Sequence, residues 1–174
     1  MRLFLAINFS VQTLAELQRH IDELRRQSRQ GRFSRPENLH LTLVFLGECN
    51  EAEAALAEST MQSISFSGFD LEFDRLGRFK TRQGDLWWAG AGENAALLNL
   101  QSQLEAALQA AGFALQNREF AAHVTLGRDV KTSVSPHTID VFGEPVRQVD
   151  LMLSKQQKGG VSYTPIASHL AMDC

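Results

Sequence analysis

The sequence predicts an α+β fold of two pseudo-symmetric lobes, each a mainly antiparallel sheet with flanking helices, around a central groove. The first observation behind this prediction is a repeated motif, His-x-Thr-Leu, at residues 40–43 and again at 123–126. The second is that each copy lies in a short β-prone run that follows a predicted helix. The third is spacing: the motif histidines lie 83 residues apart (His40 to His123), about half of the 174-residue chain. A period this long, present only twice, suits two related lobes rather than a solenoid.

Length and composition indicate a single domain over residues 1–174. With 44% hydrophobic residues, the chain can bury one well-packed core but is short for two. The net charge of −3 excludes a broadly basic protein that coats nucleic acid, although it is compatible with a small basic cleft. Cys49 and Cys174 lack metal-type spacing and would close a very long loop, so a reduced, cytoplasmic protein is expected.

The N-terminus carries no recognisable targeting segment. Only five apolar residues, 3–7, precede Asn8, whereas a secretory apolar region needs roughly 7–15. No run approaches the roughly 18 apolar residues of a membrane span. We therefore expect no membrane association, and no obligate protein partner is evident.

Apolar periodicity predicts four elements in the first part of the chain. They are a buried strand over 3–9, a helix from 11 to just before Gly31 with Ser10 as its N-cap, the first motif strand over 38–46, and an amphipathic helix over 50–64. Pro36 prevents a helix between the first helix and the motif strand. Arginines crowd this helix end and loop: Arg25, Arg26, Arg29, Arg32 and Arg35.

The second part of the chain repeats the order of helix, loop and motif strand. Its predicted elements are a strand over 66–76 with breaks at Gly68 and Gly77, a strand over 86–89, a helix over 94–112, the second motif strand over 120–127, an irregular stretch with Pro136 and Pro145, and a hairpin of 146–155 and 161–172. Trp87 and Trp88 point to opposite faces of their strand, so at most one should be buried.

Each motif places an imidazole and a hydroxyl on the same face of its strand. Side chains at positions i and i+2 share a face, about 6.6 Å apart. His40 and Thr42 therefore lie opposite a predicted apolar face of Leu39, Leu41, Leu43 and Phe45. In the second motif, His123 and Thr125 lie opposite Ala122, Val124 and Leu126. The small or apolar neighbours Val44, Ala121 and Gly127 leave room for a ligand.

Two such faces in one groove predict metal-free acid–base chemistry on a phosphate ester. One imidazole can take a proton from water while the other, protonated, gives one to the departing oxygen, each transfer typically worth about 10²–10⁴ in rate. The hydroxyls of Thr42 and Thr125 can donate to phosphate oxygens. No carboxylate cluster or Cys/His ligand set accompanies them, so we expect no metal.

These residues carry a family resemblance. The chain resembles the 2H phosphoesterases, and among them the bacterial RNA 2',3'-cyclic phosphodiesterases, also called 2'-5' RNA ligases. The matching stretches cover the whole chain: residues 2–7, 38–48 (Asn-Leu-His-Leu-Thr-Leu-Val-Phe-Leu-Gly-Glu), 120–128 and 160–165. One position departs: relatives usually have proline where this chain has Ala122, which bears on local rigidity rather than on the chemistry.

The resemblance implies a fold and an activity. The fold is two four-stranded antiparallel sheets around a central catalytic groove. The activity is hydrolysis of an RNA terminal 2',3'-cyclic phosphate to a 2'-phosphomonoester, with His40 as proton donor, His123 as proton acceptor, and Thr42 and Thr125 holding the phosphate. No cofactor is implied, and the partner is RNA with cyclic phosphate ends or a related nucleotide. Since coupled histidines titrate as a pair, the two could exchange roles.

Other candidates have two interpretations each. Arg128 is either a substrate-binding residue, if a bulge at Gly127 re-aims it, or part of a surface ion pair. Tyr163 and Phe4 either stack a terminal base or belong to the core. The basic run either follows an RNA backbone, through Arg32 and Arg35 above all, or is a solvated helix end. His20 lies off the apolar stripe of its helix and should be solvated. A zinc site that draws on His20, His137 and His169 together with the two motif histidines is a minor alternative.

Three functions remain open at this point. The leading one is a cyclic phosphodiesterase. The second is a 2'-5' RNA ligase, or a phosphodiesterase for a non-RNA cyclic phosphate or a 2'-5' linkage, with the same catalytic residues. The third is a non-catalytic module that binds RNA ends, which would favour permanent cations such as arginine over two histidines.

Overall fold

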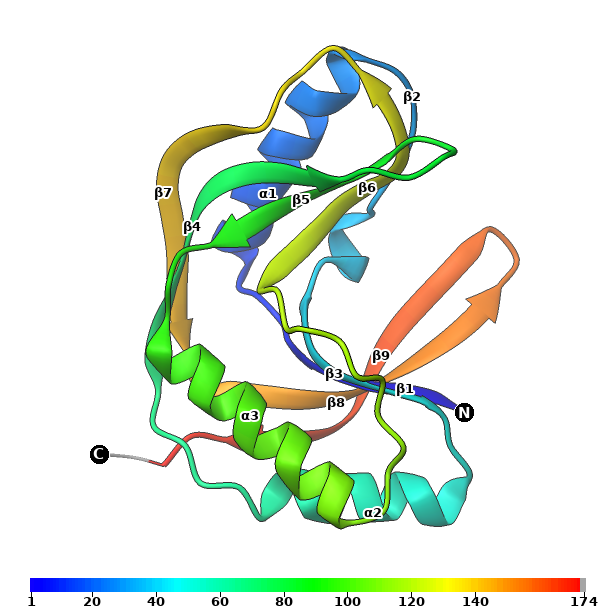
Figure 1. Ribbon diagram of the computed structural model, residues 1–174, viewed down its shortest axis with the longest axis vertical. Coiled ribbons are helices and arrows are strands. Elements are labelled where there is room, and N and C mark those ends of the chain that lie inside the picture. The colour runs from blue at the N-terminus through cyan, green and yellow to red at the C-terminus, as the bar shows by residue number, and fades with distance from the viewer. Residues whose placement is uncertain (173–174) are drawn as a thin grey trace.

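The computed structural model describes residues 1–172 and shows an α+β fold with a mainly antiparallel sheet (Figure 1). The predicted fold class is confirmed. Cys174, on which part of the prediction of a reduced protein rests, lies outside the described residues. In chain order the elements are β1 (Arg2–Ile7), α1 (Val11–Arg26), β2 (Ser28–Phe33), the short 3-10 helix η1 (Pro36–Asn38), β3 (Leu41–Glu48), α2 (Glu51–Gln62), β4 (Phe69–Phe79), β5 (Asp85–Ala91), α3 (Ala95–Ala110), β6 (His123–Thr132), β7 (His137–Val146), β8 (Gln148–Gln157) and β9 (Gly160–Leu170).

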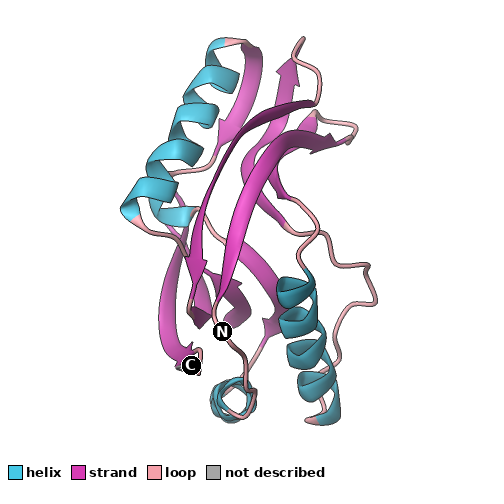
Figure 2. Cartoon of the chain, turned by 90° about the vertical axis from the view of Figure 1, so that its left-hand side faces the viewer, coloured by secondary structure: helices cyan, strands magenta, loops and turns pink. Residues whose placement is uncertain are grey.

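The strands form two lobes that are joined by very little strand pairing. The strand order is β7-β4-β5-β6-β3-β1-β8-β9, with β2 paired to β6. Where the lobes meet, β3 and β6 share the single residue pair Leu41 and Val124. In Figure 1 the upper lobe contains β2, β4 to β7 and α1, and the lower lobe contains β1, β3, β8, β9, α2 and α3. Figure 2 shows from the side that α1 covers the upper lobe and that α2 and α3 lie at the lower one.

Neither lobe is one half of the sequence. The lower lobe joins β1 and β3 to the distant β8 and β9, so the chain passes between the lobes more than once. The upper lobe also has five strands rather than the four that the resemblance implies, because β2 adds to the far part of β6.

Two strands lie where the sequence predicted none. The first helix ends at Arg26, and residues 28–33, assigned to its end and to a loop, form β2. The stretch predicted to be irregular forms β7. β2 is mostly polar, and the apolar residues of β7 (Ile139, Val141, Phe142 and Val146) do not alternate regularly with polar ones, so neither strand shows the apolar alternation of a half-buried strand. Because β7 pairs only with β4, Pro145 is tolerated on a sheet edge.

The core fills each lobe between its sheet and its helices. In the lower lobe, Leu97, Leu100, Leu104 and Leu108 of α3 are buried, as the spacing of this helix predicts. In the upper lobe, α1 buries Leu17, Ile21 and Leu24 at helical spacing. Trp87 is fully buried and Trp88 only partly, as the alternation of their strand requires. No helix within residues 1–172 is long and apolar enough to cross a membrane.

His20 differs from its prediction. It was expected to be solvated, yet it is only 6% exposed and its ring stacks on Phe142 of β7 at 5.6 Å. His20 lies three residues after Leu17 and four before Leu24, at one edge of the buried face of α1, and β7 packs against that edge. That strand was not predicted, so its contact with His20 was not either.

Candidate active site

Two hydrogen bonds orient the His40 ring just before the start of β3. Its Nδ1 lies 2.7 Å from the backbone carbonyl of Asn38, and its Nε2 lies 3.0 Å from Oγ1 of Thr42. Because a carbonyl only accepts, the proton of the neutral ring is on Nδ1, and Thr42 donates to Nε2. The Asn38 side chain in turn donates to the carbonyl of Val161 on β9. Hydrogen bonds of Asn38 therefore link His40 to the C-terminal hairpin.

His123 is arranged in the same way at the start of β6. Its Nδ1 lies 2.6 Å from the carbonyl of Ala121, two residues earlier, so Nε2 carries the lone pair of the neutral ring. The neighbouring strand β5 places Gly90 beside His123 and Trp88 beside Thr125. In both motifs, a carbonyl two residues before the histidine selects Nε2 as the nitrogen available for chemistry.

The junction of the lobes brings the two motifs together. Leu41 and Val124, the one pair shared by β3 and β6, are completely buried on the core face. Their neighbours in each strand point to the opposite face, and an antiparallel register about this pair sets His40 across from Thr125 and Thr42 across from His123. All four side chains line one groove of about 760 Å³.

Aromatic rings surround each imidazole. Phe4 and Tyr163 lie 4.9 and 5.0 Å from the His40 ring, and Tyr163 meets it edge-on. Phe79 and Trp88 lie 5.5 and 6.4 Å from the His123 ring. Both residues line the groove, but Phe4 is buried, whereas Tyr163 is half-buried.

Phe79 and Trp88 were not predicted as site residues. Trp88 shares the face of Thr125 across the β5–β6 ladder, a relation between residues 37 positions apart that no local pattern reveals. Its indole packs flat on the β4 backbone: a Cβ added at Gly77 would lie 2.2 Å from the ring. Glycine at this position therefore lets the indole reach the side of His123.

A bulge in β6 turns Arg128 into the groove. Strict alternation would place Arg128 on the face opposite His123. On β5, however, the adjacent residues Trp88 and Trp87 pair with Thr125 and Gly127, so Leu126 is an extra residue in β6 that reverses the alternation before Arg128. A further shift of the pairing follows between Gly127 and Val130, where Asp129 adopts a left-handed backbone conformation (φ 54°). Its carboxylate accepts hydrogen bonds from Arg32 of β2, at 2.8 Å to Nε. With the alternation reversed at Leu126, Arg128 lines the groove.

A second bulge, in β3, corrects the prediction for Val44 and Phe45. Leu5 pairs with Val44 but Ala6 pairs with Thr42, so Leu43 is an extra residue that reverses the alternation. Val44, predicted to leave room for a ligand, is buried in the core. Phe45, predicted to face the core, is 38% exposed and lines the groove.

The groove is strongly basic in a protein of net charge −3. Its lining includes four arginines, Arg2, Arg32, Arg35 and Arg128, and none of the lining residues within the described chain is Asp or Glu. Of the basic run in the sequence, Arg32 and Arg35 thus lie at the groove. Arg25 instead pairs with Asp22 on the surface of α1, as a solvated helix end would.

Both motif histidines are poised to be neutral. Burial lowers the pKa of His40 below its usual value of 6.5, and the positive charges of His123 and Arg128 lower it further, against the opposing effect of the Asn38 carbonyl. Burial also lowers the pKa of His123, with Arg128 acting in the same direction and the Ala121 carbonyl against it. An anion bound between the rings would reverse these shifts by stabilising an imidazolium.

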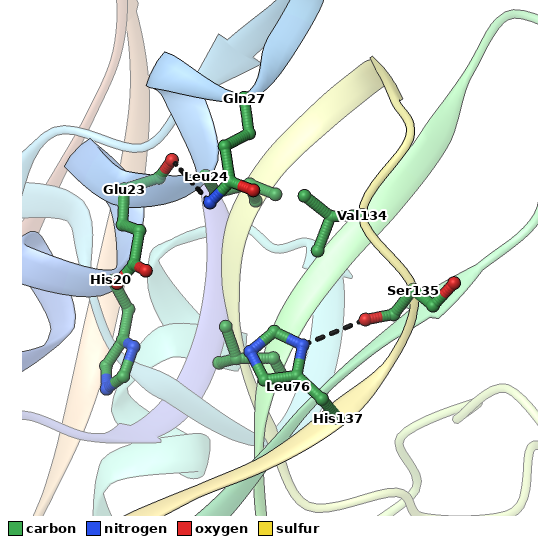
Figure 3. A pocket seen from close by; sticks show the side chains of 8 residues that line it. All are labelled: His20, Glu23, Leu24, Gln27, Leu76, Val134, Ser135 and His137. Carbon is green, nitrogen blue, oxygen red and sulfur yellow. Dashed lines mark hydrogen bonds between the residues drawn. The ribbon is translucent and has the colours of Figure 1, made fainter.

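The remaining histidines lie elsewhere. Figure 3 shows His20 of α1 and His137 of β7 at a separate cavity of about 350 Å³, where His137 Nδ1 is bonded to the carbonyl of Ser135. The Nε2 of His169 is hydrogen-bonded to the carbonyl of Ile64. Residues 1–172 contain no group of three or more His, Cys, Asp or Glu placed to hold a metal ion, so the structure gives no support to the zinc alternative.

The chain is similar to known proteins in sequence and in fold. The family described as "2'-5' RNA ligase superfamily" matches residues 13–153. A protein of Escherichia coli named "RNA 2',3'-cyclic phosphodiesterase" is 30% identical over 169 residues, 95% of this chain and 93% of that protein. One of the same name from Archaeoglobus fulgidus is 33% identical over 116 residues, which span 63% of this chain and 65% of the relative. The crystal structure of E. coli LigT complexed with 3'-AMP has a TM-score of 0.83 at 27% identity and covers 99% of this chain and 98% of that one.

Proposed function

The chain belongs to the 2'-5' RNA ligase superfamily, and from that premise we propose that it hydrolyses RNA terminal 2',3'-cyclic phosphates to 2'-phosphomonoesters. The observation that carries the proposal is the pair of imidazoles in one basic groove, each with Nδ1 bonded to a carbonyl and Nε2 available. Two such rings can supply the acid and the base that a phosphodiester needs. Because each lobe contributes one of them, residues 1–174 act as one domain.

The reaction proceeds by one in-line displacement. Nε2 of neutral His123 accepts a proton from water as the water oxygen bonds to phosphorus. The bond from phosphorus to O3' breaks, and Nε2–H of protonated His40 gives its proton to O3'. The products are a 3'-hydroxyl and a 2'-phosphomonoester. His123 leaves the step protonated and His40 neutral, so one proton transfer between them or with solvent restores the site.

The other groove residues stabilise the charge on phosphorus. Thr42 and Thr125 donate hydrogen bonds to the non-bridging oxygens, and Arg128 places a permanent cation beside both histidines. In the free protein Thr42 donates to Nε2 of His40. Once His40 is protonated its Nε2 becomes a donor, so the Thr42 hydroxyl is released to bind the phosphate. The negative phosphate in turn favours that protonation, which couples substrate binding to charging of the acid.

An RNA oligonucleotide with a 2',3'-cyclic phosphate end tests the proposal. In the presence of EDTA we expect full turnover, because the lining of the groove supplies imidazoles, hydroxyls and guanidiniums but no carboxylates. Phosphorus NMR should show a 2'-phosphomonoester as the only product. A 3'-phosphomonoester, or activity abolished by EDTA, would contradict the mechanism. A 2'-5'-linked product would favour ligation, and stoichiometric binding without turnover would favour an RNA-end binding module.

The pH dependence of kcat/KM follows from the lowered pKa values. His123 must be neutral, so activity falls as the pH drops through its pKa. His40 must carry a proton in the transition state, so kcat/KM also falls as the pH rises through the pKa that His40 has in the free enzyme. Both pKa values lie below 6.5, so the optimum of kcat/KM lies on the acid side of that value.

Replacing Arg128 by Gln checks this assignment independently of rate. The variant removes a cation that lowers the pKa of both histidines, so both limbs of the profile should move to higher pH. Arg19→Gln, on the exposed side of α1 and paired with Glu16, is the matched control and should leave the profile in place. A profile that does not move in the Arg128 variant would contradict the electrostatic role of this residue.

A further inference from the structure

Phe45 and Arg2 form a stacked pair in the groove, away from the histidines. Phe45 reaches the groove because of the β3 bulge at Leu43, and it is 38% exposed although it lies in β3, the strand of the lower lobe that meets the upper lobe. The guanidinium of Arg2 lies over this ring, 5.2 Å from its centre. Within residues 1–172, Arg2 takes part in none of the ion pairs, so its charge is not neutralised by a neighbouring carboxylate.

The pair lies along the sheet from the reacting phosphate. On β1, Ala6 pairs with Thr42 and Phe4 pairs with Phe45, so Phe45 is one two-residue step, about 6.6 Å, from the motif hydroxyl. Arg2 is two such steps away, about 13 Å, beside Ser154 of β8. The groove lining is continuous from the histidines to all three of these residues.

The chemistry of a cyclic phosphate end decides what can lie there. A 2',3'-cyclic phosphate closes the 3' end of a strand, so any further nucleotide must be attached on the 5' side. The terminal phosphate lies between the histidines, and the penultimate nucleotide must follow the groove outward. An exposed aromatic face beside an arginine is a surface on which a base stacks, with little preference among bases.

We propose that Phe45 and Arg2 form a stacking subsite for the base of the penultimate nucleotide, so that the preferred substrate is an oligonucleotide end rather than a mononucleotide cyclic phosphate. This inference rests on the proposed phosphodiesterase function. Ser154 is the third residue of the subsite, and a single hydroxyl cannot distinguish four bases. The subsite therefore selects for a second nucleotide and not for a sequence.

The test is a ratio of two rates. We compare kcat/KM for a dinucleotide that ends in a 2',3'-cyclic phosphate with kcat/KM for the corresponding mononucleotide. The wild-type protein should prefer the dinucleotide, and Phe45→Ala should reduce that preference by roughly tenfold or more, as loss of one stacked base predicts. Phe45→Leu, which keeps the apolar volume without the ring, should show the same loss, while Phe45→Tyr should restore the preference.

Control variants separate stacking from charge. Arg2→Lys keeps the charge but loses the planar guanidinium, so it should lower the dinucleotide preference less than Phe45→Leu does. Arg19→Ala, outside the groove, should leave the ratio unchanged. A second readout is the fluorescence of 2-aminopurine at the penultimate position of the dinucleotide product, which should be quenched on binding to the wild-type protein and not to Phe45→Leu.

The outcomes distinguish the subsite from the activity itself. If the wild-type protein hydrolyses neither substrate, the proposed function fails. If it hydrolyses both and the ratio is the same in Phe45→Leu as in the wild type, the activity stands and the subsite is overturned. Equal 2-aminopurine quenching by the two proteins would overturn the subsite as well.

Discussion

Alanine in place of His40 or His123 is expected to lower kcat by roughly 10²–10⁴-fold for each variant, because each removes one proton transfer from the displacement. The two rings have equivalent hydrogen bonds through Nδ1, so truncation takes away the only ring nitrogen in position for the reaction. The measurement is single-turnover hydrolysis of an RNA 2',3'-cyclic phosphate end, with circular dichroism to show that the fold is kept.

His137→Ala is the matched control for both variants. The Nδ1 of His137 is bonded to the carbonyl of Ser135, two residues earlier, as in the motif histidines, but it lies outside the groove. This variant should keep full activity. Loss of less than about tenfold in either motif variant would contradict the acid–base assignment.

A change of leaving group separates the acid from the base. A nitrophenyl phosphodiester expels a phenolate that needs no proton, so it should restore much of the activity of His40→Ala. It should not restore that of His123→Ala, which lacks the base that activates water. The opposite pattern would mean that the two histidines exchange roles in this protein.

The second large effect is expected at the threonines. Thr42→Val and Thr125→Val keep the shape of the side chain but remove the hydroxyl, and loss of one preorganised donor to a developing charge typically costs about 10²–10³ in kcat. Serine at either position should retain most of the activity, since it keeps the donor. Single-turnover rates on the same RNA end measure both effects.

Thr132→Val provides the control for the threonine variants. Thr132 lies at the far end of β6 and donates its hydroxyl to the carbonyl of Gln27, away from the groove. Its replacement should affect stability more than rate. If the motif valine variants lower kcat no more than Thr132→Val does, the hydroxyls do not contact the phosphate in the transition state.

Local periodicity was enough for the well-buried elements. The three helices were predicted because apolar side chains recur at helical spacing and each helix buries one face, as Leu97, Leu100 and Leu104 do in α3. The strands β2 and β7 were missed because each lies at an edge of the sheet: β2 is mostly polar, and the apolar residues of β7 do not alternate regularly with polar ones. His20 was misplaced for the same reason, since β7 is what covers it.

Two bulges cause the differences between the predicted and the observed orientation of Phe45 and Arg128. Strict alternation places Phe45 in the core and Arg128 away from His123, and each is turned into the groove by one extra residue in its strand. A bulge depends on how a strand pairs with its neighbours, and these are distant in sequence: Arg128 lies beside Arg32 of β2. The residue pattern of one strand alone therefore cannot predict where it bulges.

The sequence by itself determined which residues carry the proposed chemistry. A period of two in a strand places each histidine and its threonine on one face whatever the rest of the chain does, and the buried residues between them keep that face outward. Only the tertiary structure decided that the two faces share a groove, since this depends on the single pair of Leu41 and Val124. It also decided what surrounds them, including four arginines and the exposed ring of Phe45, because these positions result from pairing between distant strands and not from local pattern.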